Sequence, residues 1–69
     1  MKKCKLSPDK HYRNSHGAIR KVTHASPSMV RYIVTHSGAR FASEIEKEGS
    51  TKIVSVNEFL NWATSEVIV

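Results

Sequence analysis

The clearest pattern in the chain is an alternation of apolar and polar residues over positions 29–36. Val30, Tyr32 and Val34 share one face of an extended chain, and all three are apolar or aromatic. The opposite face is mixed and comprises Met29, Arg31, Ile33 and Thr35. An apolar face opposite a mixed one is typical of a strand that is buried on one side only, so the sequence predicts a half-buried strand here.

Shorter runs on both sides of this segment predict further strands. They cover residues 18–24, 40–45 and 52–56, each with β-branched or aromatic residues. Hairpin turns are expected at 14–17, 25–28 and 37–38, because glycine tolerates positive φ and proline does not fit a central strand. The polar segment 46–51 is predicted to be a solvated connector.

The hydrophobic period changes near Ser55. Val56, Phe59, Leu60 and Ala63 follow helical spacing, and Ser55 with Glu58 matches the capping box S-x-x-E. The pattern predicts a helix of about 8–10 residues, whose Phe59 and Leu60 face must dock on the sheet because so short a helix is unstable alone. Residues 67–69 are apolar and are expected to pack or to pair as an edge strand.

These elements predict a mainly β domain with one C-terminal helix. A small SH3-like barrel capped by the helix is the first expectation, and a curled antiparallel sheet with one packed helix is the alternative. At 69 residues the chain is near the lower limit for a single apolar core. Residues 1–10 lack periodicity and carry four lysines, so we expect a basic N-terminal arm followed by one globular domain at 11–69.

Charge and cysteine content indicate the kind of partner and the cellular compartment. The net charge is +5, and residues 1–40 hold nine Lys and Arg against Asp9 alone. Such a balance favours acidic partners. Cys4 is the only cysteine, so no internal disulfide can form and a reducing compartment is expected. No apolar core of a signal peptide and no membrane-length apolar run occurs, so we expect a soluble cytoplasmic protein without a membrane partner.

Candidate chemistry is sparse. The four histidines and Cys4 do not match the paired spacing of zinc sites, so neither a metal nor another cofactor is expected. Glu44, Glu46 and Glu48 fall around the predicted connector, and Glu58 has a capping role. Because no nucleophile, acid–base pair or glycine-rich phosphate loop is evident, we expect a protein that is not an enzyme.

One set of residues occurs in a fixed order along the chain: Tyr12 and Gly17, then Val22, then Val30, Arg31 and Tyr32, and finally Phe59 in the predicted terminal helix. This order resembles a class of short phage and prophage proteins of uncharacterised function. The resemblance covers most of residues 11–62. It implies a curled β-sheet with a terminal helix, and an accessory gene of a mobile element with no assigned activity.

Together these observations predict a non-enzymatic binding protein, a phage or mobile-element modulator or inhibitor that binds a host protein in the host cytoplasm. The alternative is binding of DNA or RNA through a basic SH3- or OB-like surface, with Tyr12 or Tyr32 stacking on a base. The candidate partner-binding residues are Arg20, Lys21, Arg31, Tyr32, Arg40 and Trp62. The aromatic members equally fit a core, and Trp62 lies beside the apolar helix stripe, where half exposure is expected.

Overall fold

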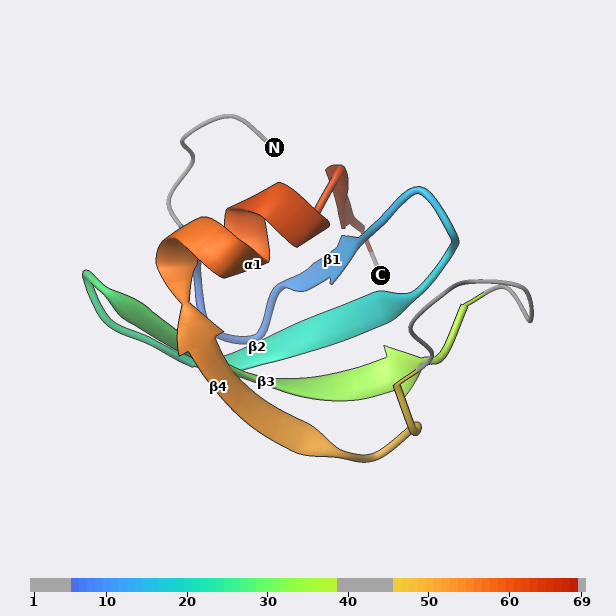
Figure 1. Cartoon of the computed structure of the whole chain (residues 1–69), viewed down its shortest axis with the longest axis horizontal. Helices are drawn as coiled ribbons and strands as arrows, with labels where there is room; N and C mark the ends of the chain where they lie inside the picture. Colours follow the sequence, from blue (N-terminus) through green and yellow to red (C-terminus); the bar gives the residue numbers. More distant parts are fainter. Residues whose placement is uncertain (1–5, 39–45, 69) are drawn as a thin grey trace.

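The computed structural model describes residues 6–38 and 46–68, and it shows one curved sheet with one helix against it (Figure 1). The elements are β1 (His11–Arg13), β2 (Ile19–Ala25), β3 (Met29–His36), β4 (Thr51–Ser55), α1 (Val56–Trp62) and β5 (Ser65–Val67). The strands lie in the order β4-β3-β2-β1-β5, and every neighbouring pair is antiparallel. The predicted mainly β fold with a C-terminal helix is confirmed.

The sheet is not closed, so the SH3-like barrel that was our first expectation is not found. β4 and β5 form the two ends of the strand order. Along the chain, β4 leads directly into α1, and β5 follows the helix. The helix lies over one face of the sheet (Figure 1). The apolar residues of the helix thus fill the space that would be the interior of a closed barrel. The curled sheet capped by a helix describes the fold.

The strand predicted over residues 29–36 is β3, with the predicted bounds and faces. Val30, Tyr32 and Val34 are buried, while Met29 and Arg31 are exposed. The turn before β2 also forms as expected, because the Asn14 side chain accepts hydrogen bonds from the backbone of the turn and Gly17 takes a φ of 83°. The predicted strand at 40–45 lies outside the described residues.

The switch from β4 to α1 occurs at Ser55, as the capping box predicted. The Ser55 hydroxyl accepts a hydrogen bond from the Glu58 amide at 3.1 Å. The helix spans seven residues and is slightly shorter than expected. It ends at Trp62 because Ala63 is extended, with φ −77° and ψ 137°.

Phe59 occupies the centre of the core. It is fully buried, and its ring lies 5.6 Å from those of Tyr12 and Tyr32. The rest of the core comes from Leu6, Val22, Val30, Val34, Leu60 and Ala63. Aromatic side chains of two strands therefore converge on the helix, which confirms that the Phe59 face docks on the sheet.

Both ends of the described chain belong to the domain. Leu6 is buried in the core, and the amide of Asp9 donates a hydrogen bond to the Val22 carbonyl at 2.8 Å. Residues 6–10 of the predicted arm therefore pack on the sheet, whereas residues 1–5 lie outside the described part. Val67 pairs with His11 within β5, so an edge strand forms near the predicted place, but it covers Ser65–Val67 and not 67–69. Ile68 is exposed, and residue 69 lies outside the described part. In the described ranges, no helix has the length and apolarity to cross a membrane.

Candidate partner-binding site

The sheet has two faces of different chemistry. Successive side chains of a strand point to opposite sides, so the buried residues of β1, β2 and β3 identify the face that α1 covers. We call this the helix-covered face, and the opposite one the outer face. Residues proposed from the sequence as partner contacts are divided between the two.

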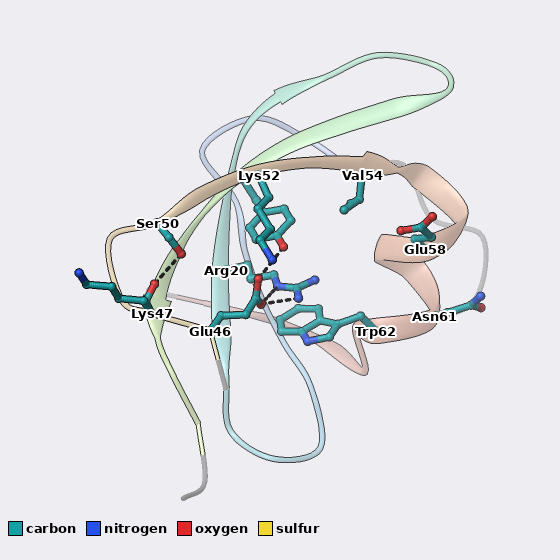
Figure 2. Close-up of a pocket in the computed structure, with 10 residues that line it drawn as sticks. Arg20, Glu46, Lys47, Ser50, Lys52, Val54, Glu58, Asn61 and Trp62 are labelled. Atoms are coloured by element: carbon teal, nitrogen blue, oxygen red, sulfur yellow. Dashed lines mark hydrogen bonds and ion pairs between the residues drawn. The ribbon is translucent and has the colours of Figure 1, made fainter. Parts of the chain in front are cut away.

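On the helix-covered face, Arg20 lies against two aromatic rings. Its guanidinium carbon is 3.8 Å from the centre of the Trp62 ring and 4.2 Å from that of Tyr32. Figure 2 shows the guanidinium beside the Trp62 indole, with Glu46 next to both. Such close stacking is favourable for a planar cation, so Arg20 connects β2, β3 and α1.

Glu46 completes this group, which we call the Arg20 cluster: Arg20, Tyr32, Glu46 and Trp62. One carboxylate oxygen of Glu46 accepts hydrogen bonds from Nε of Arg20, at 2.7 Å, and from Nη2 of the same side chain. The other oxygen accepts from the Tyr32 hydroxyl at 2.7 Å. The side chains of Arg20 and Glu46 are only 11% and 15% exposed, so the cluster leaves little of the guanidinium for a partner.

The prediction of a solvated connector at 46–51 is wrong for Glu46, whose side chain is mostly shielded from solvent. The sequence placed this residue in a run of charged positions and gave no sign of its partner, which is 26 positions away. A carboxylate is drawn into the site because the cation on β2 and the hydroxyl on β3 together satisfy both of its oxygens. Glu46 is thus the site residue that the sequence did not indicate.

The Tyr32 hydroxyl is held in its neutral form. Burial is the main cause, followed by the hydrogen bond to Glu46, and together they raise the pKa of Tyr32 above its ordinary value. The residue is 1% exposed. Tyr12 is 2% exposed, so neither of the tyrosines that were considered for base stacking presents its ring to solvent. Trp62, by contrast, is partly buried at the edge of the core, as predicted.

A pocket of about 970 Å³ opens beside the Arg20 cluster, between β4 and α1 (Figure 2). Its walls outside the cluster come from Lys47, Ser50, Lys52, Val54, Glu58 and Asn61. Among the residues described, neither Lys47 nor Lys52 makes an ion pair. The pocket therefore places Lys52 near Trp62, whereas the Lys47 side chain extends away from the Arg20 cluster at the pocket's edge and Glu58 lines the side of α1 (Figure 2).

The outer face carries unstacked cations. Strand alternation places Arg13, Lys21 and Arg31 on it, together with the apolar residues Met29, Ile33 and Ile53. Lys21 pairs across the strands with Ile33, and Arg31 pairs with Ile53. The outward strand positions in the described residues include no acidic side chain, although Asp9 in the turn before β1 approaches Lys21 to 3.8 Å. Exposed pairs of that kind contribute little to stability.

The six candidate residues therefore separate. Arg20, Tyr32 and Trp62 meet in the Arg20 cluster, and Lys21 and Arg31 lie on the outer face. Arg40 lies outside the described residues. The sequence alternation alone would have separated Arg20 from Lys21, since neighbouring positions of one strand point in opposite directions.

No group of three or more potential metal ligands occurs within the part of the chain that the structure describes. Cys4 falls outside that part. The chain was also compared with known proteins, and no family model, curated protein or solved structure matches it.

Proposed function

We propose that the protein is a non-enzymatic binding protein whose outer sheet face docks on an acidic surface of a partner protein. The observation that carries the proposal is that Arg13, Lys21 and Arg31 share this face with exposed apolar residues, and that no acidic strand residue lies on it in the described ranges 6–38 and 46–68. Following the resemblance to phage and prophage proteins, we propose a host protein as the partner, and modulation of that host protein as the role.

The outer face mixes the two ingredients of a protein interface. Met29 and Ile53 are 43% and 57% exposed, and they flank Arg31 across two strands. An arginine surrounded by apolar side chains is a common interface anchor, because the neighbours exclude water from its ion pairs. The basic charge would guide the approach of an acidic partner and orient it.

Nucleic acid is a second candidate because the same cations could contact phosphates. The aromatic residues argue against binding of single-stranded DNA or RNA, because that mode depends on bases stacking on exposed aromatic rings. Tyr12, Tyr32 and Phe59 are buried, and Trp62 already stacks on Arg20. Apolar Met29 and Ile53 beside Arg31 favour a protein over a phosphate backbone.

The test is retention of proteins from a bacterial lysate on the immobilised chain, with and without nuclease and at moderate salt. We expect one protein to be retained irrespective of nuclease, and the Lys21→Glu/Arg31→Glu variant to lose it. The control is Lys10→Glu, which also reverses a charge but lies at the other end of the sheet in an ion pair with Glu66.

Two outcomes would contradict the proposal. If material is retained only without nuclease, the cations bind phosphates. If Lys10→Glu weakens retention as much as Arg31→Glu alone, which changes the net charge by the same amount, net charge governs binding, and the outer face has no specific role.

A further inference from the structure

The free edge of β4 is the place where the two faces meet. β4 is an end strand and pairs only with β3 among the strands described. At its two ends the Ser50 carbonyl accepts a hydrogen bond from the Val34 amide, and the Val56 amide donates one to the Ser28 carbonyl, so alternate residues of this segment face β3. The same alternation turns the backbone groups of Thr51 and Ile53 towards the free edge. A further strand would find donors and acceptors there.

A hollow lies on each side of this edge. On the helix side is the pocket beside the Arg20 cluster, to which β4 contributes Lys52 and Val54. On the outer side is an apolar groove of about 390 Å³, lined in part by Met29, Arg31 and Ile53. Side chains of an added strand would alternate between these hollows, because successive residues of a strand point to opposite sides.

The chemistry of the hollows differs, and that difference defines an occupant. Lys47 and Lys52 line the helix side without an ion pair among the residues described, while Met29 and Ile53 leave apolar surface exposed on the outer side. An extended segment that alternates acidic and apolar residues would satisfy both. A second copy fits less well, since it would bring its own Lys47 and Lys52 to the same edge and add to the net charge of +5.

We infer that the protein captures its partner by strand addition: an extended segment of the partner, alternating acidic and apolar residues, pairs with the free edge of β4. Its acidic side chains face Lys52 and Lys47, and its apolar side chains cover Ile53 and Met29. Main-chain hydrogen bonds supply affinity in this mode, and the alternate side chains supply specificity. The inference rests on the proposed function: the added segment lies at the β4 end of the outer face, and the partner's acidic surface beyond it contacts Arg31 and Lys21.

The test uses the whole protein and a capped peptide of about ten residues in which glutamate and valine alternate, with binding followed by amide NMR shifts. We expect saturable binding below about 1 mM, with the largest shifts at Thr51 and Ile53. The matched peptide of alternating lysine and valine should not bind. The same acidic peptide with alternate N-methylated residues cannot complete the main-chain ladder, and should bind at least about tenfold more weakly.

Two protein variants separate the main chain from the side chain at one position. Ile53→Pro removes an amide that faces the free edge and leaves the β3 pairing intact, so it should abolish peptide binding. Ile53→Ala keeps that amide and should retain binding within about threefold, as expected for partial loss of one apolar contact. Lys52→Glu should weaken binding at least about tenfold, and Lys10→Glu should leave it unchanged.

Strand addition is overturned if the acidic peptide fails to bind, or if N-methylation leaves binding unchanged. These results are distinguishable from failure of the proposed function. Nuclease-resistant retention that depends on Lys21 and Arg31 but survives Ile53→Pro would preserve a protein partner on the outer face. It would replace strand addition with docking of a folded surface.

Discussion

Arg20 and Lys21 are neighbours in sequence and carry the same charge, yet the structure gives them opposite surroundings. Arg20 stacks on Trp62 and Tyr32 and pairs with Glu46, whereas Lys21 points to the outer face, where Asp9 is its one ion-pair partner among the described residues. Strand geometry produces the difference, because a step of one residue reverses the face. The number of basic residues in a strand therefore indicates the charge of a partner's surface only when the residues on each face of the sheet are counted separately.

The comparison predicts that substitutions on the helix-covered face lower stability, while those on the outer face do not. The largest effect is expected for Phe59→Ala, which leaves a cavity among Tyr12 and Tyr32. The loss should be on the order of 3 kcal/mol of unfolding free energy, measured by urea denaturation. Ile53→Ala, on the outer face, is the control and should change stability by less than about 0.5 kcal/mol. A mild effect of Phe59→Ala would show that the helix does not cover the core.

Removal of Arg20 should have the next largest effect. Arg20→Ala leaves the Glu46 carboxylate without its cation in a site that is mostly shielded from water. We expect a loss of about 2 kcal/mol, less than for a fully buried pair, and a change below about 0.5 kcal/mol for Lys21→Ala. The double variant Arg20→Met/Glu46→Gln should recover part of the loss, because no charge is then left unpaired. Equal losses of unfolding free energy in Arg20→Ala and Lys21→Ala would contradict the difference between the two faces.

A smaller effect is expected at the helix cap. Ser55→Ala removes the acceptor of the Glu58 amide, so unfolding free energy should fall by about 1 kcal/mol. Ser55→Asp keeps an acceptor at the cap and should stay close to the wild type. No loss in Ser55→Ala would mean that this hydrogen bond contributes nothing to holding α1 on the sheet.

The smallest effect concerns alkaline pH. The raised pKa of Tyr32 means that the folded protein keeps the hydroxyl proton at a pH where an unfolded tyrosine, with a pKa of about 10, has lost it. This contribution to stability is fully present below pH 10 and is lost as the pH rises above it. Unfolding free energy measured between pH 9 and 11 should therefore fall more steeply for the wild type than for Tyr32→Phe. Parallel curves would contradict a shielded hydroxyl.

The sequence predicted the elements better than the site, for physical reasons that differ between them. β3 and the Ser55 cap depend on residues close together in the chain, so alternation and the capping box were sufficient. The open edge of the sheet depends on whether β4 meets β5, which no local pattern determines. The pairing of Glu46 with Arg20 likewise depends on the completed fold, and in sequence it looked like one charge in a solvated run.

The candidate site shows the same limit. The aromatic and basic residues were identified as types suited to binding, and Trp62 was expected at the edge of the helix stripe, where it lies. Strand alternation was sufficient to predict which of these basic and aromatic residues lie on each face of the sheet. It was not sufficient to predict which side chains they contact. Arg20 lost its role as a free cation only because Trp62, Tyr32 and Glu46 surround it.

The most direct test of this division is to measure stability and partner retention on the same two variants, Arg20→Ala and Arg31→Ala. Both remove an arginine from adjacent strands, but the two side chains lie on opposite faces. We predict that Arg20→Ala lowers the unfolding free energy and, at a temperature where it remains folded, retains the nuclease-resistant partner. Arg31→Ala should keep wild-type stability and lose the partner. Loss of the partner in folded Arg20→Ala together with normal retention by Arg31→Ala would contradict the account.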